Sequence, residues 1–171
     1  MSNSRSSRIS LIGMPGSGKS TVGVLLAKRI GLAFVDTDIL IQEQEQATLA
    51  EIIARSSAFV LREIEEQVLL DMPITDSVIS TGGSVVYSPA IMERLSAAST
   101  VVYLRAQLET VDYRISLAPD RGIASPGNHT LEDVYNERAP RYEQYSDIVV
   151  DVDHDTPEAI TGQIIAQLDT L

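Results

Sequence analysis

A glycine-rich run, Gly13-Met14-Pro15-Gly16-Ser17-Gly18-Lys19-Ser20, constrains this sequence more than any other feature. It matches the pattern G-x-x-x-x-G-K-[ST] at every fixed position. The apolar residues 9–12 precede it, and residues 19–30 carry apolar side chains at helical spacing. Between a strand and a helix, such a turn lets backbone N–H groups point inward at the phosphates of a nucleotide. The run therefore predicts a nucleoside triphosphate site in an α/β fold.

Two residues of this phosphate-binding loop (P-loop) are expected to act on the nucleotide directly. Lys19 should reach the β- and γ-phosphates, and the hydroxyl group of Ser20 should bind Mg²⁺. The alternative is a chance match, which ordinary residue usage would produce in roughly one chain of this length per hundred or more. The strand before the run and the helix after it make chance rarer still. The expected nucleotide contacts in this region are Gly13, Pro15, Gly16, Ser17, Gly18, Lys19, Ser20 and Thr21.

Short β-branched runs alternate with longer helical patterns along the chain, which favours a parallel sheet covered by helices. The runs are almost continuously apolar, as strands buried on both faces should be. The expected strands are 8–12, 33–35, 77–80, 100–104 and 148–152. The expected helices are 19–30, 49–54, 59–71, 89–97, 108–116, 131–145 and 157–168. At 171 residues the chain fits one domain, expected at residues 8–171 after a flexible tail of residues 1–7.

The net charge of −11 argues against a general nucleic-acid or anionic-membrane surface. Only Lys19 and Lys28 are lysines, and the other basic residues are arginines. An acidic protein that handles phosphates must gather its positive charge locally, so the positions of the arginines matter. The chain has no cysteine, which excludes disulfides and thiolate chemistry. No apolar run approaches the ~18 residues that a membrane span needs, and we expect a cytoplasmic protein without nucleic-acid or membrane partners.

Asp36 and Asp38 follow the apolar residues 32–35, at the expected carboxyl end of a strand. Open α/β sheets bind their ligands along that edge. The two carboxylates can divide the work, because one supports the Mg²⁺ shell while the other accepts or orients the proton of an attacking hydroxyl group. The alternative is structural: Asp38 stands just before Ile39 and Leu40 and could cap a helix.

Arg62 and Arg138 are the candidate acceptor-binding arginines, since two guanidinium groups can clamp a carboxylate or a phosphate. Arg62 could equally be a solvated helix residue that pairs with Glu65 or Glu66. Pro140 interrupts the helical pattern that contains Arg138 and should kink it.

Gly82 and Gly83 follow the expected strand 77–80. Adjacent glycines there let the backbone approach a ligand and offer N–H donors, or simply make a turn. Residues 118–129 are turn-rich with little periodicity, which indicates either a lid or a surface loop. We expect packing or surface positions, rather than catalysis, for Tyr87, Tyr103, Tyr135 and Tyr142.

In this order, the features resemble the shikimate kinases over nearly the whole chain, from Ile9 to Leu168. Apart from the P-loop no short motif is specific, but the ordered set is. The matching pieces are Ser20-Thr21-Val22-Gly23, Leu26-Ala27, Phe34-Val35-Asp36-Thr37-Asp38, Arg62 with Glu65, Thr81-Gly82-Gly83, Pro89, Val101-Val102-Tyr103-Leu104, Arg114, Arg121, Arg138-Ala139-Pro140-x-Tyr142 and Pro157.

The resemblance implies a P-loop kinase of the nucleoside-monophosphate-kinase type. Its fold would be a five-stranded parallel sheet flanked by helices on both faces, with a mobile lid at about residues 112–130. ATP with Mg²⁺ would be the phosphoryl donor and shikimate the acceptor, within aromatic amino-acid biosynthesis. By position, Asp36 would support Mg²⁺ together with Ser20. Asp38 would bind the ring hydroxyl groups of the acceptor and could act as the base.

The resemblance also implies roles for arginines and glycines. Arg62 and Arg138 would clamp the shikimate carboxylate, and Gly82 and Gly83 would line the same pocket. The residues implied at the adenine and the transferring phosphate are Arg114 and Pro157 beside the adenine and Arg121 on the phosphate. The expected catalytic residues are Lys19, Asp38 and Arg121.

The departures from the family pattern lie in the acceptor half and at the lid. Ser84 stands where a third glycine is usual, and Leu61 where phenylalanine usually precedes the arginine. Ser57-Ala58 replaces a usual Gly-Glu, and Gly122 a usual proline after the lid arginine. The alternatives are therefore a kinase for another hydroxy acid such as gluconate, a nucleoside monophosphate kinase, or a homologue that binds nucleotide without catalysis. We expect a monomer.

Overall fold

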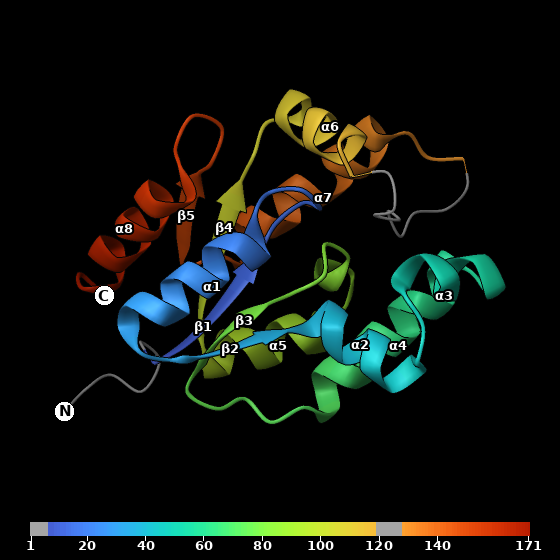
Figure 1. Cartoon of the computed structure of the whole chain (residues 1–171), viewed down its shortest axis with the longest axis horizontal. Coiled ribbons are helices and arrows are strands. Elements are labelled where there is room, and N and C mark those ends of the chain that lie inside the picture. The colour runs from blue at the N-terminus through green and yellow to red at the C-terminus, as the bar shows by residue number, and fades with distance from the viewer. Residues whose placement is uncertain (1–6, 119–127) are drawn as a thin grey trace.

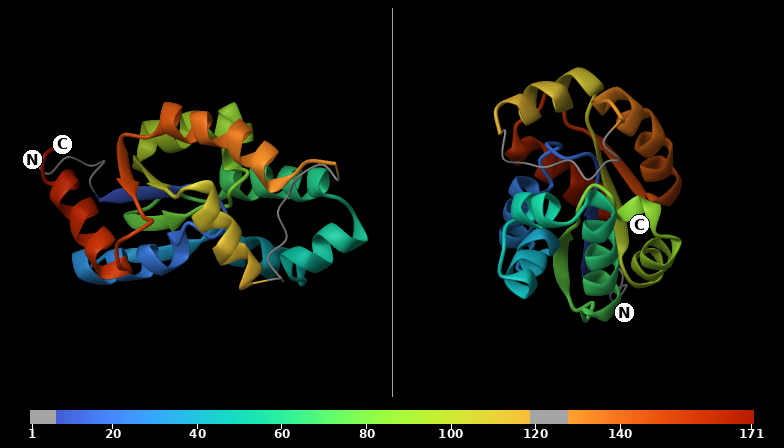
Figure 2. Two further views of the ribbon diagram at one scale, coloured as in Figure 1. Left: turned by 90° about the horizontal axis from the view of Figure 1, so that it is seen from above. Right: turned by 90° about the vertical axis from the view of Figure 1, so that its right-hand side faces the viewer.

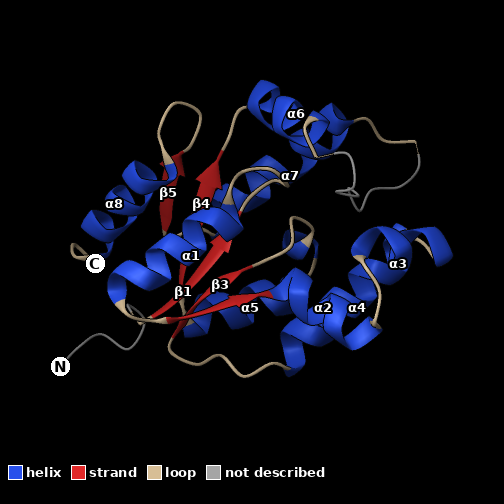
Figure 3. Cartoon of the chain, in the orientation of Figure 1, coloured by secondary structure: helices blue, strands red, loops and turns tan. Residues whose placement is uncertain are grey.

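A computed structural model describes residues 7–118 and 128–171, with a parallel sheet at its centre (Figures 1 and 3). Its five strands lie in the order β2-β3-β1-β4-β5, and each neighbouring pair is parallel. This order places the carboxyl ends of β1, β2 and β3 next to one another, where open α/β sheets bind ligands. The strands are β1 (Arg8–Ile12), β2 (Ala33–Asp36), β3 (Ser77–Ser80), β4 (Thr100–Arg105) and β5 (Ile148–Asp151).

The described helices are α1 (Lys19–Ile30), α2 (Thr37–Glu45), α3 (Leu49–Arg55), α4 (Ala58–Asp71), α5 (Pro89–Ala98), α6 (Leu108–Ser116), α7 (Leu131–Tyr145) and α8 (Pro157–Leu168), with a 3₁₀ turn, η1 (Val85–Tyr87). They cover both faces of the sheet (Figure 2). α1 and α8 pack together on one face, and α5 and α7 contact β4 on the other. Among these helices, none has the length and apolarity that a membrane crossing requires.

The predicted α/β fold with a five-stranded parallel sheet is confirmed, but the sequence patterns do not predict α2. This helix begins directly after β2. Its N-cap is Asp36, whose carboxylate accepts a hydrogen bond from the N–H group of Asp38 at 3.0 Å. The idea that Asp38 caps a helix is therefore wrong. Asp38 lies in the first turn, where its negative charge interacts favourably with the helix dipole.

Buried apolar side chains form two clusters. The larger cluster surrounds the sheet and includes Ile9, Val78 and Val101. The smaller one, which we call the small core, consists of Ile41, Ile52, Leu61 and Val68 and lies among α2, α3 and α4. The elements that carry Asp38 and Arg62 are thus packed largely on each other rather than on the sheet.

α7 carries two large side chains into the interior. Thr130 caps its start in a capping box, and the helix continues through Pro140 to Tyr145. Arg138 and Tyr142 are fully buried one turn apart, and the ring of Tyr142 stacks on that of Tyr103 with 5.1 Å between centres. The expected packing role of these two tyrosines is confirmed. Their stacking helps to hold the arginine in place beside the sheet.

Candidate active site

The P-loop joins the end of β1 to the start of α1, as the sequence predicts. Gly13 has a φ of 150°, and a Cβ there would lie 2.7 Å from the carbonyl oxygen of Leu104, so no larger residue fits. Gly16 and Gly18 also have positive φ angles. The loop therefore curls in front of the N-terminus of α1, where backbone N–H groups and the helix dipole attract phosphate.

Lys19 lies over this loop. Its Nζ donates hydrogen bonds to the carbonyl oxygens of Gly13 at 2.8 Å and Met14 at 2.9 Å, and the residue is only 7% exposed. A buried ammonium group must be hydrogen-bonded, and here the loop itself supplies acceptors. The predicted phosphate-binding charge is thus fixed beside the amides that would share the phosphates with it.

Ser20 and Asp36 lie side by side at the sheet edge. The hydroxyl group of Ser20 donates to Oδ2 of Asp36 at 2.6 Å and lies 3.3 Å from the hydroxyl oxygen of Ser80. Hydroxyl and carboxylate oxygens suit Mg²⁺, which usually takes few protein ligands and completes its shell with phosphate oxygens and water. Within residues 7–118 and 128–171, no cluster of acidic, histidine or cysteine side chains could hold a metal alone. The donor set therefore fits an Mg²⁺ ion shared with a nucleotide.

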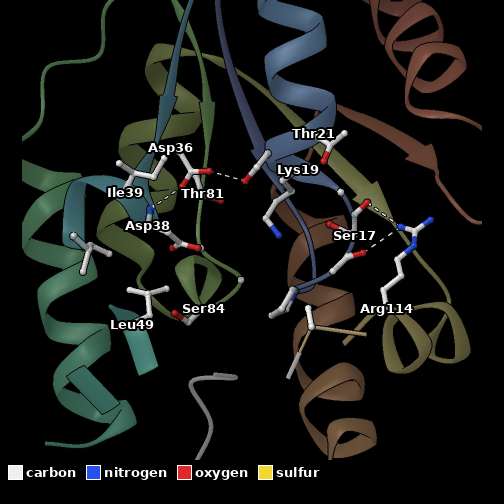
Figure 4. Close-up of a pocket in the computed structure, with 18 of the residues that line it drawn as sticks. Ser17, Lys19, Thr21, Asp36, Asp38, Ile39, Leu49, Thr81, Ser84 and Arg114 are labelled. Carbon is white, nitrogen blue, oxygen red and sulfur yellow. Dashed lines mark hydrogen bonds between the residues drawn. The ribbon is translucent and has the colours of Figure 1, made fainter. Parts of the chain in front are cut away.

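Arg114 reaches the P-loop from α6. Its Nη1 donates to the carbonyl oxygens of Gly16 at 3.1 Å and Ser17 at 3.3 Å, and its Nη2 to that of Val152 at 3.0 Å. Figure 4 shows the guanidinium group beside Ser17. Pro157, the first residue of α8, lines the same cavity. Both predicted adenine-side residues therefore lie at the P-loop end of the site.

A cavity of about 950 Å³ extends from the P-loop to α4 (Figure 4). Its size is at the upper end of the range for small-molecule sites. Gly13 and Arg62 are not among its lining residues, and Arg121 lies outside the described residues. The predicted site residues that line it are Pro15, Gly16, Ser17, Gly18, Lys19, Ser20, Thr21, Asp36, Asp38, Gly82, Gly83, Arg114, Arg138 and Pro157.

Arg138 forms part of the other end of this cavity and is 1% exposed. Its Nε donates to the hydroxyl oxygen of Tyr87 at 3.3 Å. A Cβ on Gly83 would lie 3.0 Å from Nη1 of Arg138 and 2.7 Å from Cδ of Pro15 in the P-loop. Gly83 therefore separates the nucleotide loop from the buried arginine at a point with no room for a side chain. The glycine pair lies in a turn, closed by the hydrogen bond that the N–H group of Val85 donates to the carbonyl oxygen of Gly82 at 3.4 Å, and it is also a point of close approach.

Arg62 approaches Arg138 across an aromatic ring. Its Cζ lies 4.1 Å from the centre of the Tyr87 ring, and the Cζ of Arg138 lies 5.1 Å from it. The structure thus brings the two predicted acceptor arginines together, although they come from α4 and α7. The Nε atom of Arg62 is buried, and Glu65 on the same helix is only 4% exposed, so this part of α4 does not face solvent.

Glu65 is a site residue whose environment the sequence patterns missed. It lines the cavity, and the hydroxyl group of Ser84 donates a hydrogen bond to its Oε2. Burial raises the pKa of Glu65 to about 7; the charge of Asp38 also raises it, whereas the Ser84 bond and the charge of Arg138 lower it. A Cβ on Gly82 would collide with Oε1 of Glu65 and lie 3.3 Å from Oδ1 of Asp38. Two carboxyl groups therefore meet at the glycine pair.

Comparison with known proteins agrees with this site. A family model described as shikimate kinase matches residues 15–169. The shikimate kinase of Paracidovorax citrulli is 35% identical over 163 residues, which cover 92% of this chain and 89% of that protein. The shikimate kinase of Mycobacterium avium is 34% identical over 172 residues, which cover 92% and 91%. The chain belongs to the shikimate kinase family.

Solved structures place the chain in the same shikimate kinase family. The shikimate kinase from Acinetobacter baumannii, in complex with shikimate, matches with a TM-score of 0.87 at 26% identity, over 95% of this chain and 92% of that one. A gluconokinase from Sinorhizobium meliloti shares only the fold, with a TM-score of 0.56 at 18% identity over 98% and 94%. The expected family is thus confirmed. As a shikimate kinase family member, the chain is a phosphotransferase that uses ATP.

The positions that depart from the shikimate kinase pattern have defined local roles here. Leu61 belongs to the small core and is 5% exposed. Ser57 is the N-cap of α4, and its side chain accepts a hydrogen bond from the first turn. Ser84 donates to Glu65. Gly122 lies outside the described residues. The described departures therefore add an apolar contact and a hydrogen bond at the cavity, from Leu61 and Ser84, and a helix cap at the start of α4.

Proposed function

We propose that this chain transfers the γ-phosphoryl group of Mg²⁺-bound ATP to the 3-hydroxyl group of shikimate, which yields shikimate 3-phosphate and ADP. The observation that carries the proposal is that Lys19 of the P-loop and the buried Arg138 line the same cavity. A phosphate-binding end and a carboxylate-binding end in one space suit in-line transfer to a small hydroxy acid. The relatives named as shikimate kinases, and the neighbour that holds shikimate, support this acceptor.

The donor end would bind the nucleotide largely through the P-loop. Lys19 and the loop N–H groups would hold the β- and γ-phosphates, and Ser20 and Asp36 would hold Mg²⁺. Mg²⁺, when bound, would supply charge neutralisation at the phosphate oxygens. Arg114 and Pro157 would border the adenine.

The acceptor end would orient shikimate and remove a proton. Arg62 and Arg138 would bind its carboxylate, and Gly82 and Gly83 would let it approach the backbone closely. Asp38 would bind the reacting hydroxyl group and accept its proton as the new P–O bond forms and the bond to ADP breaks.

Arg121 is proposed to neutralise the transferring phosphate, and it lies outside the described residues. It belongs to a proposed lid at about residues 112–130, whose closure would keep water from competing as acceptor. We also propose a single domain of residues 8–171 after a flexible tail of residues 1–7, acting as a cytoplasmic monomer without nucleic-acid or membrane partners.

A coupled ADP-release assay with Mg²⁺-ATP tests the proposed function. Purified protein would be given shikimate, gluconate or nucleoside monophosphates in parallel. We expect turnover that depends on shikimate and exceeds the other two. Turnover with gluconate or a nucleoside monophosphate instead would reassign the acceptor, and nucleotide binding without any turnover would indicate a homologue that has lost catalysis.

A further inference from the structure

Tyr87, the last residue of η1, has three guanidinium groups around its ring. The Cζ atoms of Arg62, Arg141 and Arg138 lie 4.1, 4.9 and 5.1 Å from the ring centre. Arg62 comes from α4 and the other two from α7, and η1 packs against both helices. The ring is therefore a contact shared by the two helices that bring arginines to the acceptor end.

The ring of Tyr87 offsets the repulsion between the positive charges of Arg62 and Arg138. Arg62 and Arg138 place like charges on the same ring, and their repulsion grows where water is excluded. Arg141 is partly exposed and pairs with Glu137 at 3.7 Å. An aromatic face attracts a cation within about 6 Å of its centre, most strongly where the pair is desolvated. Stacking also fixes the plane of a guanidinium group and hence the direction of its N–H fork.

The hydroxyl group of Tyr87 adds a smaller, separate contact. It accepts the hydrogen bond from Nε of Arg138 at 3.3 Å, which is long for a bond of this kind. The ring acts on three arginines and the hydroxyl group on one. Of Tyr87 and the three arginines, Arg138 alone is among the described residues that line the cavity. An effect of Tyr87 on the acceptor must therefore pass through Arg138 or through a neighbouring arginine.

We propose that Tyr87 is a positioning residue for the acceptor: its ring sets the spacing and orientation of the guanidinium groups of Arg62 and Arg138, and Arg141 adds a third charge on the same ring. This inference rests on the proposed function, because it takes the acceptor's carboxylate to be the group that these arginines receive. It adds a determinant of carboxylate selectivity that lies outside the residues in contact with the cavity.

The test compares Tyr87→Leu, which removes the ring, with Tyr87→Phe, which removes only the hydroxyl group. We expect Tyr87→Leu to raise the KM for shikimate about tenfold, the ratio that 1.4 kcal/mol produces, with little change in kcat or in the KM for ATP. Tyr87→Phe should stay within about twofold of the unaltered enzyme, because the lost hydrogen bond is long.

Tyr135 provides the matched control. It lies on α7 one turn before Arg138, is partly buried, and donates its hydroxyl hydrogen to the carbonyl oxygen of Ala106 at 2.9 Å. Tyr135→Leu and Tyr135→Phe therefore remove the same groups from a tyrosine on the helix that carries Arg138 and Arg141, and the three arginine–ring contacts of Tyr87 stay in place. Both should leave the KM for shikimate close to that of the unaltered enzyme.

Shikimate methyl ester separates positioning from general destabilisation. The ester lacks the carboxylate charge, so Tyr87→Leu should reduce the preference for the acid over the ester, whereas a merely loosened pocket would weaken both equally. An unchanged acid-to-ester ratio, an equal rise in the KM for ATP, or the same effect in Tyr135→Leu would overturn the inference alone. No shikimate-dependent turnover in the unaltered enzyme would instead overturn the proposed function, and this inference with it.

Discussion

The two ends of the cavity are built in different ways. The nucleotide end comes mainly from one continuous stretch, residues 13–20, and Lys19 is held by carbonyl groups of that same stretch. The acceptor end is assembled from side chains on separate elements, with Asp38 on α2, Glu65 on α4 and Arg138 on α7. A site of backbone groups in sequence leaves few positions free to change. A site of dispersed side chains can change one residue at a time.

The largest expected effect is at the nucleotide end. Lys19→Ala should lower kcat about 10³-fold with every acceptor, because it removes a positioned charge from the transferring phosphate. Lys28, the other lysine of the sequence, is exposed at the end of α1, so Lys28→Ala should leave kcat unchanged. ADP release at saturating ATP and shikimate measures both. Substantial activity in Lys19→Ala would mean that the P-loop assignment is wrong.

The next effect is a pH dependence located at the acceptor end. The pKa of Glu65 is about 7 in the folded protein and 4.5 in a model compound. The stability that this group contributes is complete below about pH 4.5 and is lost as the pH rises through about 7. Glutamine cannot ionise, so Glu65→Gln does not lose this stability as the pH rises. The free energy of unfolding of Glu65→Gln, relative to that of the unaltered protein, should therefore increase by about 3 kcal/mol from pH 4.5 to pH 7.

Urea unfolding at pH 5 and pH 8 measures this gain. Glu66→Gln is the matched control, since Glu66 neighbours Glu65 on α4 but accepts its hydrogen bond from Ser88. The hydrogen bond from Ser84 lowers the pKa of Glu65, so Ser84→Gly should raise this pKa further. The loss of stability should then occur at higher pH. A Glu65→Gln advantage that is the same at both pH values would show that Glu65 keeps an ordinary pKa.

Arg138→Ala should separate the two ends by substrate. Loss of a buried guanidinium group from the acceptor pocket should raise the KM for shikimate about thirtyfold, with a much smaller change in the KM for ATP. Arg138→Lys should recover only part of the loss, because it restores the charge without the planar fork. If the two KM values rise equally, Arg138 supports the fold rather than the acceptor.

The smallest effect is expected at Gly83, where the nucleotide end and the acceptor end of the cavity meet. A Cβ on Gly83 would press on both Pro15 and Arg138, so Gly83→Ala should raise the KM values for ATP and shikimate together, by about fivefold each. Gly162→Ala in α8 is the control, since its Cβ would meet Arg29 at an ordinary 3.7 Å. A change in only one KM would show that the ends are independent at this glycine.

The sequence predicted those parts of the fold whose patterns are local. Strands β1, β3 and β4 are short apolar runs, and α1 and α8 have clear helical periodicity or caps. The helix α2 was missed because its sequence, TDILIQEQE, is short and rich in Glu and Gln, with little apolar periodicity. Its start depends on Asp36, which terminates a strand and caps a helix at once.

The same contrast explains which site residues could be found. The P-loop is contiguous, so its geometry follows from the motif. Glu65 looks like a solvent-facing helix residue, and only the approach of Ser84 from another segment reveals that it is buried. Tyr87 stands in an unremarkable apolar stretch, and its contacts with Arg62 and Arg138 require α4 and α7 to be placed in space. No local pattern carries that information.

The small core packs the helices of the acceptor end against one another. Ile41, Ile52, Leu61 and Val68 are buried among α2, α3 and α4, and α4 continues to Leu69 in the larger cluster. A large-to-small substitution in the small core, such as Leu61→Ala, would therefore loosen the helices that carry Asp38 and Arg62, while the P-loop stays attached to the sheet.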